Sequence, residues 1–565
     1  MNSDPCARIK YVFRGIGLLL GSIEGYVSRN AINPDGRSYL DLAQAYLHHD
    51  WATTVNAYWS PLYAWLLALT LGVARPSLRS EFPVVHALNV ALFFVSLAAF
   101  EFFWSGLMEV RKSADDVHTT GGLPETVLWS LGYPFFIWLS VGSLVSMINP
   151  DLVVMTLVLL IAGVLIRIHG SGDSVWHLHF LLGLLLGIGY LTKAVMFPAG
   201  FLFVATTSRN QPKTRWLQPI VVALVFLVVC SPQIIVLSRA KGRLTFADTG
   251  RLAYAWYTYH LPVRNWQGSP TSGTPVHPTR KLYEHPTVFE FNGPIHGSYP
   301  PWQDPSYWNE GMRPVFNSLQ MARHVRQDLT EILGTILQPR YWICGMLLIL
   351  FVAAPRESLR AIGRQWFLIV PALLVMAMYA VTFVTFRYFP PWVLLLWSAF
   401  LAGVRLRGHL GNSWMYRVLA IILAGLLLAA TAYGTYGQAR HGRGDDATPE
   451  YETAEGLAKV GVRSGTKVAA IGFDNDAHWA YLGGFNVIAE IGSDDACAFW
   501  SAPLAERDKV LSEFARTGAN AVIANGGSGV KNTMGTSLEL LQRCTRDAQG
   551  WTPIPGTRNL VYMIR

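Results

Sequence analysis

Long apolar runs recur along most of the chain and set its fold class. The run VVALVFLVVC at 221–230 is one example, and LAIILAGLLLAATA at 419–432 is another. A helix needs about 20 apolar residues to cross the ~30 Å hydrocarbon core of a bilayer. We therefore expect an α-helical polytopic membrane protein with about 11 transmembrane helices. The expected spans are 11–28, 84–106, 125–146, 151–167, 176–192, 194–208, 216–238, 336–354, 366–385, 389–405 and 415–434.

Two apolar segments decide the topology. The segment WSPLYAWLLALTLGVA at 59–74 is short and has Ser-Pro near its start, which suits the first turn of a helix. We expect it to form a juxtamembrane helix at the outer interface. The apolar run at 180–206 is expected to break between Lys193 and Pro198 into two short helices. If either interpretation fails, the sidedness of every later segment inverts.

Basic residues give these spans an orientation. Lys and Arg gather in short connections such as 111–112, 209–215 and 356–364. Cytoplasmic loops of membrane proteins carry an excess of these residues. All the basic connections face the cytoplasm when the N-terminus is cytoplasmic, so we expect a multi-pass protein of the inner, or cytoplasmic, membrane. The same bias explains the net charge of +9 without a nucleic-acid partner.

Polar segments that face outward complete the organisation of a transmembrane domain at 1–435. They are a first outer loop (29–83), which contains the juxtamembrane helices, and a long outer loop (241–333). The long loop is rich in Pro, Gly and aromatic residues, and loops of this length are usually functional or disordered. The aromatic density argues against disorder.

The C-terminal tail has a different pattern. Short apolar runs bounded by turn residues, which are typical of buried strands, occur at 466–472, 485–491 and 519–525. An amphipathic helix ending at a glycine is expected at 504–518. After a linker at 436–450, we therefore expect a small soluble extracytoplasmic α/β domain at 451–565.

Composition supports this division of the chain. Of the 565 residues, 52% are hydrophobic and only 14% are charged, whereas soluble proteins carry about 25% charged residues. Five cysteines are too few for a disulfide scaffold. Cys497 and Cys544 fall in the tail, where they either stay unpaired or form a pair if the tail lies outside.

The first outer loop carries a candidate catalytic carboxylate. From Gly36 onward the pattern is that of an amphipathic helix lying on the outer surface of the membrane, with Arg37 and Asp41 on its polar stripe. Asp35 stands at the start of this helix. It either caps the helix, a role worth about 1 kcal/mol, or serves chemistry.

Isolated charges occur in two other outward connections. Lys193 and Arg387 each stand alone beside an apolar helix. A cation within the membrane costs about 2.5–3.5 kcal/mol on insertion scales, so such residues usually line a pathway or meet a partner. The alternative is that both extend to phospholipid headgroups. Asp151 either shares their function or stabilises the dipole of the helix that it begins.

Five short motifs occur in a fixed order between about residues 10 and 435. They are Asp35-Gly36-Arg37-Ser38-Tyr39, Ser60-Pro61-Leu62-Tyr63, Asn149-Pro150-Asp151, GLLLGIGYLTK at 183–193, and Arg387-Tyr388 with Pro390. In this order they resemble motifs of the GT-C superfamily of polytopic glycosyltransferases, which includes the protein O-mannosyltransferases and the lipid A aminoarabinose transferase.

The resemblance implies a function. Members of the family transfer a sugar from a polyprenyl-phosphate carrier to a glycan, lipid or protein acceptor on the outer face, with inversion at the anomeric carbon. Asp35 is then expected to be the general base that takes the proton of the acceptor hydroxyl. The donor phosphate is expected to bind Lys193, Arg387, Arg37 and Arg251. Further substrate contacts are expected from Asp151, Tyr39, Asp41, Tyr63, Tyr388 and Trp256.

One position departs from the family pattern. Gly36 follows Asp35, where many relatives carry a second acidic residue. A pair of carboxylates that binds a metal is therefore not expected here, and no cofactor is predicted, with a divalent metal as the alternative. Two other functions stay open, a secondary transporter and a sugar-binding membrane scaffold without catalysis. We find no internal repeat of the kind that transporters often contain.

Overall fold

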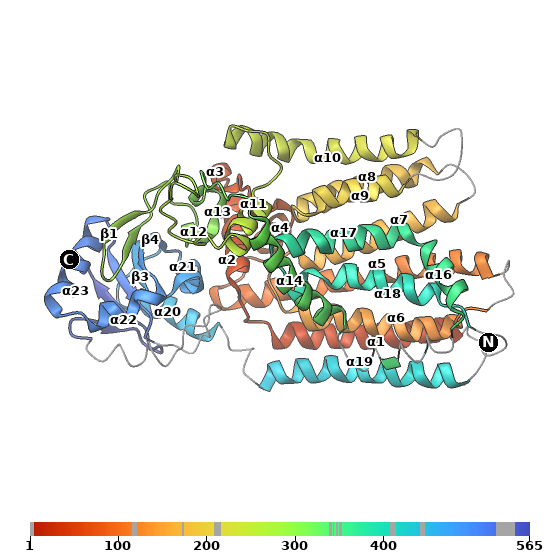
Figure 1. The fold of residues 1–565 in the computed structure, drawn as a ribbon. Coiled ribbons are helices and arrows are strands. Elements are labelled where there is room, and N and C mark those ends of the chain that lie inside the picture. The colour runs from red at the N-terminus through yellow and green to blue at the C-terminus, as the bar shows by residue number, and fades with distance from the viewer. Residues whose placement is uncertain are drawn as a thin grey trace.

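The computed structural model describes residues 5–115, 121–171, 175–207, 216–337, 342, 344–345, 349, 353–406, 414–440, 447–526 and 548–564. Figure 1 shows long helices packed side by side in one part of the molecule and a mixed β-sheet with short helices in the other. The N-terminus lies at the end of the helical bundle that is far from the sheet, and the C-terminus lies beyond the sheet (Figure 1). We call the end of the bundle that carries the sheet the domain end.

Ten described helices run along the bundle (Figure 1). They are α1 (Pro5–Val27), α5 (Glu81–Asp115), α6 (Glu125–Ser140), α7 (Asp151–Gly170), α8 (Trp176–Thr192), α9 (Met196–Thr206), α10 (Leu217–Lys241), α17 (Trp366–Thr382), α18 (Pro390–Gly403) and α19 (Trp414–Arg440). A π-helical turn, η2 (Val141–Val145), extends α6. These helices coincide with the apolar runs of the sequence, as expected of a membrane protein.

Five helices of the described chain, α5, α6 with its extension, α7, α10 and α19, are long and apolar enough to cross a membrane. The short helix α16 (Pro355–Gly363) and α17 form a bent pair that passes the same test together. The predicted span at 336–354 lies largely outside the described residues, as do the basic residues at 209–215. The number of eleven crossings thus stays a prediction.

The predicted break in the apolar run at 180–206 is present. Helix α8 ends at Thr192 and α9 begins at Met196, with Lys193 in extended conformation between them. Two glycines allow α8 to approach α10 closely, because a Cβ atom at Gly183 would lie 2.7 Å from the carbonyl oxygen of Val222, and one at Gly187 would meet α10 as well. Close packing of α8 therefore fixes the position at which Lys193 leaves the helix.

Further elements, most of them short, begin at the domain end of the bundle. They are α2 (Pro34–Leu47), α3 (Trp51–Thr54), α4 (Pro61–Ala74), η1 (Leu78–Ser80), α11 (Thr249–Ala253), η3 (Tyr254–Thr258), α12 (Pro300–Gln303), α13 (Pro305–Trp308), α14 (Ser318–Ile336) and η4 (Phe386–Tyr388). The amphipathic pattern of α2 predicts a helix on an open surface. The structure instead covers this helix on both stripes. Its apolar stripe packs on α4, and its polar stripe is covered by α12 and α21, so residues 36–40 are all buried.

The sheet belongs to a unit of alternating strands and helices near the C-terminus. Its elements are α20 (Thr448–Lys459), β3 (Lys467–Ile471), η7 (Asp474–Asp476), α21 (His478–Gly483), β4 (Asn486–Ile491), α22 (Ser493–Ser501), α23 (Leu504–Arg516), β5 (Ala521–Ala524), β6 (Thr552–Pro553) and β7 (Leu560–Met563). The predicted strands at 466–472, 485–491 and 519–525 correspond to β3, β4 and β5, and the predicted helix at 504–518 corresponds to α23. Strand β3 lies between β4 and β5 and is parallel to both.

The long loop between α10 and α14 adds a hairpin to this sheet. Strands β1 (Arg280–Tyr283) and β2 (Val288–Glu290) are antiparallel, and β2 pairs with β4, so the strand order is β1-β2-β4-β3-β5-β7-β6. Arg264 of the same loop forms an ion pair with Asp474 at 2.7 Å, beyond the carboxyl end of β3. The predicted boundary at residue 451 therefore does not separate the sheet from the preceding chain.

Candidate functional site

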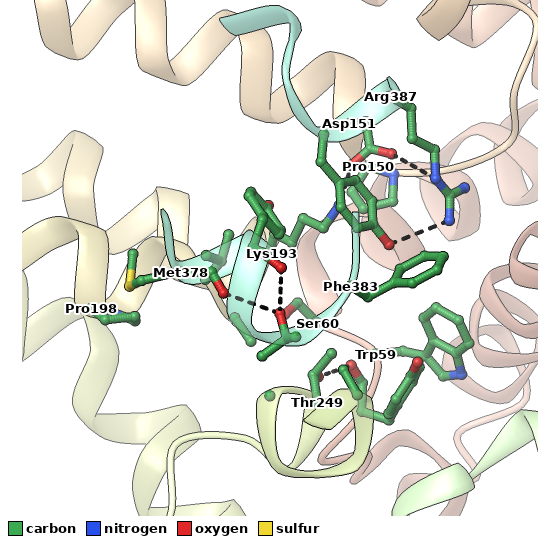
Figure 2. Close-up of a pocket in the computed structure, with 18 of the residues that line it drawn as sticks. Trp59, Ser60, Pro150, Asp151, Lys193, Pro198, Thr249, Met378, Phe383 and Arg387 are labelled. Atoms are coloured by element: carbon green, nitrogen blue, oxygen red, sulfur yellow. Dashed lines mark hydrogen bonds and ion pairs between the residues drawn. The ribbon is translucent and has the colours of Figure 1, made fainter. Parts of the chain in front are cut away.

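A cavity of about 790 Å³ opens at the domain end of the bundle. Its wall combines the N-terminal ends of α2 and α7, the turn between α8 and α9, the C-terminal end of α17, and η4. Its polar lining residues include Asp35, Tyr39, Asn149, Asp151, Lys193, Arg387 and Tyr388. Segments from very different parts of the sequence thus converge on one hollow (Figure 2).

Asp35 lies in the first turn of α2, with its carboxylate directed at a cation. The position that caps this helix is Asn33, and Asp35 instead accepts a hydrogen bond from Nη2 of Arg387 at 2.5 Å. The Asp35 and Arg387 side chains are 16% and 17% exposed, so the pair is shielded from bulk solvent without being sealed. Capping therefore does not account for the carboxylate of Asp35.

Asp151 joins this ion pair to a second cation. Its Oδ1 forms an ion pair with Nζ of Lys193, and its Oδ2 lies 3.6 Å from Nε of Arg387. The amino group of Lys193 also lies 3.5 Å from the ring centre of Tyr388. Figure 2 shows Asp151, Lys193 and Arg387 along one side of the cavity. The result is a row of alternating charge, Asp35, Arg387, Asp151 and Lys193, in which Lys193 meets a carboxylate rather than extending to a lipid headgroup.

The rest of the cavity is aromatic or apolar. Aromatic lining is contributed by Tyr58, Trp59, Tyr257, Trp302 and Phe383. An apolar stretch is formed by Val195, which precedes α9, and by residues of α9 and α17 that include Pro198, Leu202, Leu374 and Met378. In Figure 2, Pro198 and Met378 lie on the side away from Arg387. A hollow with cations at one end and an apolar wall at the other is suited to an amphiphile with an anionic headgroup.

Gly36 has a steric explanation. A Cβ atom at this position would lie 2.8 Å from Cβ of Ile148. The segment that contains Ile148 is held there because its backbone N–H donates to Oδ1 of Asn33 at 3.2 Å. A second carboxylate next to Asp35 therefore has no room. Within the described part of the chain, no three His, Cys, Asp or Glu side chains converge as a metal site, and the metal-independent reaction stays a prediction.

Five of the predicted site residues do not line this cavity. Tyr63 donates its hydroxyl to Oδ1 of Asn89 at 2.8 Å, and Trp256 packs behind the lining on Tyr58, with ring centres 5.6 Å apart. Arg251 donates to the carbonyl oxygen of Met312 at 2.8 Å. The other two, Arg37 and Asp41, lie on the opposite face of α2.

Arg37 does not reach this cavity, where the sequence suggested that it binds the donor phosphate. Its side chain is completely buried, and Nη1 donates to the backbone carbonyl of Asn475 at 2.7 Å. Burial lowers the pKa of this guanidinium, although the nearby carboxylates of Asp41, Asp476 and Glu450 oppose the shift. The reason is helical geometry: Arg37 is two residues from Asp35 and so points about 200° away around the axis. Arg37 therefore connects α2 to the C-terminal unit and does not face the site.

Other lining residues were not predicted. Tyr58, Trp59, Ser60, Thr249 and Phe383 all contact the cavity. Ser60 was noted as part of a helix start and of a family motif, but not as a site residue. Phe383 falls in an expected span, and the others stand in the two outer loops without a periodic pattern. Thr249 donates its hydroxyl to the carbonyl oxygen of Tyr58 at 2.8 Å, which joins two distant loops at the edge of the cavity.

Comparison with known proteins identifies solved structures with a similar fold. No family model matches the chain, and no curated protein matches it. Among solved structures, ArnT from Cupriavidus metallidurans bound to undecaprenyl phosphate is similar, with a TM-score of 0.51, 10% identity, and coverage of 98% of this chain and 97% of that chain. The apo state of the same protein gives a TM-score of 0.50 at 11% identity, with the same coverage.

A second solved protein has a related architecture. The apo form of the Archaeoglobus fulgidus oligosaccharyltransferase gives a TM-score of 0.50 at 12% identity, and the match covers 93% of this chain and 70% of that one. The chain therefore shares its fold with these two proteins, as the motif resemblance led us to expect.

Proposed function

We propose that this chain, which has the GT-C fold, is an inverting glycosyltransferase that moves a sugar from a polyprenyl-phosphate donor to an acceptor hydroxyl. One observation carries the proposal: a carboxylate and two cations share one wall of a cavity whose other side is apolar. The similar ArnT structure contains undecaprenyl phosphate, which is a ligand of this chemical class.

The donor is proposed to lie with its phosphate near Lys193 and Arg387. Charge-assisted hydrogen bonds from ammonium and guanidinium groups to phosphate are among the strongest in proteins. The isoprenoid chain then extends along the apolar wall formed by α9 and α17. Asp151 keeps both cations in place, since it contacts Lys193 directly and lies 3.6 Å from Arg387.

Asp35 is the proposed general base. In an inverting displacement, the acceptor oxygen attacks the anomeric carbon, the bond from that carbon to the phosphate oxygen breaks, and the acceptor proton passes to a carboxylate. The leaving phosphate needs no separate acid, because the cations stabilise its charge. Arg387 is at present held by Asp35, so a phosphate that takes over this guanidinium also leaves the Asp35 carboxylate free to accept the proton.

The domain end is proposed to face the outside of the cell. Cys497 of α22 is disulfide-bonded, and disulfides persist mainly in oxidising compartments, whereas Cys544 lies outside the described residues. The N-terminus and the short helix α16 with its arginines lie at the opposite end of the bundle (Figure 1), as the excess of basic residues in cytoplasmic loops requires. A transporter is less well supported, because transporter sites lie near the bilayer midplane and this cavity lies at helix ends.

The decisive experiment compares the full-length wild type with Asp35→Asn in lipid nanodiscs. Polyprenyl-phosphate-linked hexoses and pentoses are supplied together with membrane extract as the acceptor source, and release of polyprenyl phosphate is measured. We expect the variant to lose about 10²–10⁴-fold in rate while still binding polyprenyl phosphate. Asp508→Asn, which changes an exposed carboxylate of α23, should retain the wild-type rate. A wild-type rate in Asp35→Asn would remove this residue from the mechanism.

A further inference from the structure

A second cavity, of about 450 Å³, lies on the face of α2 opposite the catalytic cavity. We call it the α2 cleft. It is enclosed by three parts of the chain: the first loop with α2, the segment 295–298 of the long loop, and the region from α21 into β4. Its volume falls within the range of roughly 300–1,000 Å³ that is typical of small-molecule sites. None of its lining residues is used by the mechanism proposed above.

Three carboxylates of the α2 cleft accept hydrogen bonds from hydroxyl groups of neighbouring side chains. Asp41 accepts from the hydroxyl of Ser298 at 2.7 Å and from its backbone N–H at 3.1 Å. Asp50 accepts from the hydroxyl of Thr53 at 2.5 Å, and Glu81 accepts from the hydroxyl of Tyr481. Each carboxylate has about four acceptor positions, so further hydroxyl groups can be bound at the same oxygens.

Amide and aromatic groups complete the lining. Nε2 of Gln44 donates to the hydroxyl of Tyr481 at 3.3 Å, and Nδ2 of Asn486 donates to the carbonyl oxygen of Gly297 at 2.9 Å. The rings of Tyr481 and Phe485 also line the cleft. Carboxylate acceptors and amide donors suit the hydroxyls at the edge of a sugar. An aromatic ring suits the C–H groups on its face.

The charge of the α2 cleft separates it from the catalytic cavity. Its described lining holds three acidic residues and two histidines, His48 and His296, but no Lys or Arg. Such a lining disfavours phosphate, sulfate and carboxylate groups, because like charges repel across a partly buried site. The catalytic cavity has the opposite property, since Lys193 and Arg387 line it. The two cavities are thus suited to different parts of the reacting molecules.

The same two segments line both cavities. Asp35 and Asp41 are six residues apart on α2, which is about 9 Å along the helix axis. Ser298 lines the α2 cleft, and Trp302, four residues later, lines the catalytic cavity. Ser38 of α2 donates its hydroxyl to the carbonyl oxygen of Trp302 at 2.9 Å, so the wall between the cavities is one bonded unit. Because α2 with its side chains is ~10–12 Å wide, a chain of a few sugars in the α2 cleft reaches Asp35 only by passing around the edge of this wall.

We propose that the α2 cleft binds an uncharged carbohydrate portion of the acceptor, so that the acceptor is a glycan or carries one. The role as acceptor site rests on the proposed glycosyltransferase function. The binding of neutral sugar in the cleft is a separate property and is tested separately.

The test uses full-length protein in lipid nanodiscs and measures binding by native mass spectrometry. The probes are neutral oligosaccharides of two to four hexoses and uronic-acid oligomers of the same lengths. We expect wild type to bind a neutral series in preference to the acidic one. Gln44→Leu and Asp41→Asn should each weaken that binding about tenfold, which corresponds to about 1.4 kcal/mol, and should leave the affinity for polyprenyl phosphate unchanged. The matched control Gln320→Leu, on α14, should behave as wild type.

The possible outcomes separate the two proposals. The inference is overturned if no neutral oligosaccharide binds, if uronic-acid oligomers bind equally well, or if both cleft variants bind as wild type does. It is also overturned if a peptide binds in the cleft and none of the oligosaccharides does. Asp35→Asn should keep full oligosaccharide binding while losing transfer. Retained transfer in that variant contradicts the proposed function, whatever the result of the oligosaccharide measurements.

Discussion

The Asp35 carboxylate and the Arg387 guanidinium form an ion pair with an N–O distance of 2.5 Å, although 352 positions separate them in the chain. Arg387 lies in the short η4 element between two bundle helices, and Asp35 lies in the first turn of α2. The same guanidinium has a second carboxylate, that of Asp151, at 3.6 Å. Arg387 is thus shared between two anions, and a phosphate that enters the cavity competes with both of them.

Loss of either cation should weaken binding of the lipid phosphate. Lys193→Ala and Arg387→Ala should each raise the Kd for polyprenyl phosphate at least tenfold, since a hydrogen bond to a charged group contributes about 1.5–3 kcal/mol. Arg239→Ala, which removes an exposed cation near the end of α10, is the control. The measurement is titration of the protein in nanodiscs with a short-chain polyprenyl phosphate. Equal affinities in all three variants would contradict the proposed phosphate position.

Arg37 should matter for stability and not for lipid binding. Arg37→Met removes the hydrogen bond to the carbonyl of Asn475 and leaves that buried oxygen unpaired, at a cost of about 1–3 kcal/mol. We expect a lower melting temperature and an unchanged Kd for polyprenyl phosphate. Weaker phosphate binding at unchanged stability would support the sequence-based assignment of Arg37 as a phosphate ligand instead.

Glu450 should give the protein a pH-dependent stability. Burial raises the pKa of its carboxyl to about 8, although the backbone N–H of Trp479 donates to it. Because the folded protein binds this proton more tightly than the unfolded chain, the contribution is fully present below about pH 4.5 and is lost as the pH rises through about 8. In Glu450→Gln, the melting temperature relative to wild type should therefore rise between pH 5 and pH 8. A constant difference between the two proteins would show that Glu450 does not titrate in this range.

The tight packing at Gly36 should reject any side chain. Gly36→Glu is expected to reduce the folded yield, because overpacking a buried contact costs about 1–3 kcal/mol and because a charge would be buried there. Gly36→Ala should be milder. Combining it with Ile148→Gly, which removes the Cβ atom that a new Cβ at Gly36 would meet at 2.8 Å, should recover part of the melting temperature that the two single substitutions lose separately. No recovery in the double variant would mean that the contact with Ile148 is not the cause.

Periodicity and charge in the sequence predicted several residues that the structure brings together in one cavity. Lys193 and Arg387 were identified because isolated cations beside apolar helices are costly unless they have a partner. The structure gives each of them a carboxylate partner in the same cavity. Arg37 and Asp41 lie on the face of α2 away from this cavity. Periodicity shows which residues share a face of α2, but it does not show which face meets which neighbour.

The long loop shows where sequence reasoning ends. Its aromatic residues argued for order, and Trp302 does line the cavity. Its hairpin, however, pairs with β4 from the tail, with Phe289 opposite Glu490. Pairing across so many residues depends on three-dimensional proximity and leaves no local pattern. The same applies to Arg264, whose partners Asp474 and Glu490 both belong to the tail.

Strand β2 has a further consequence for how the chain matures. The ribosome completes the β1–β2 hairpin long before β4 is synthesised, so the nascent protein carries a strand edge without its partner. That edge is covered only after the final segment has been delivered to the same side of the bilayer. A chain that stops after α19 leaves it exposed to other nascent chains, so loss of the tail should impair biogenesis of the helical part as well.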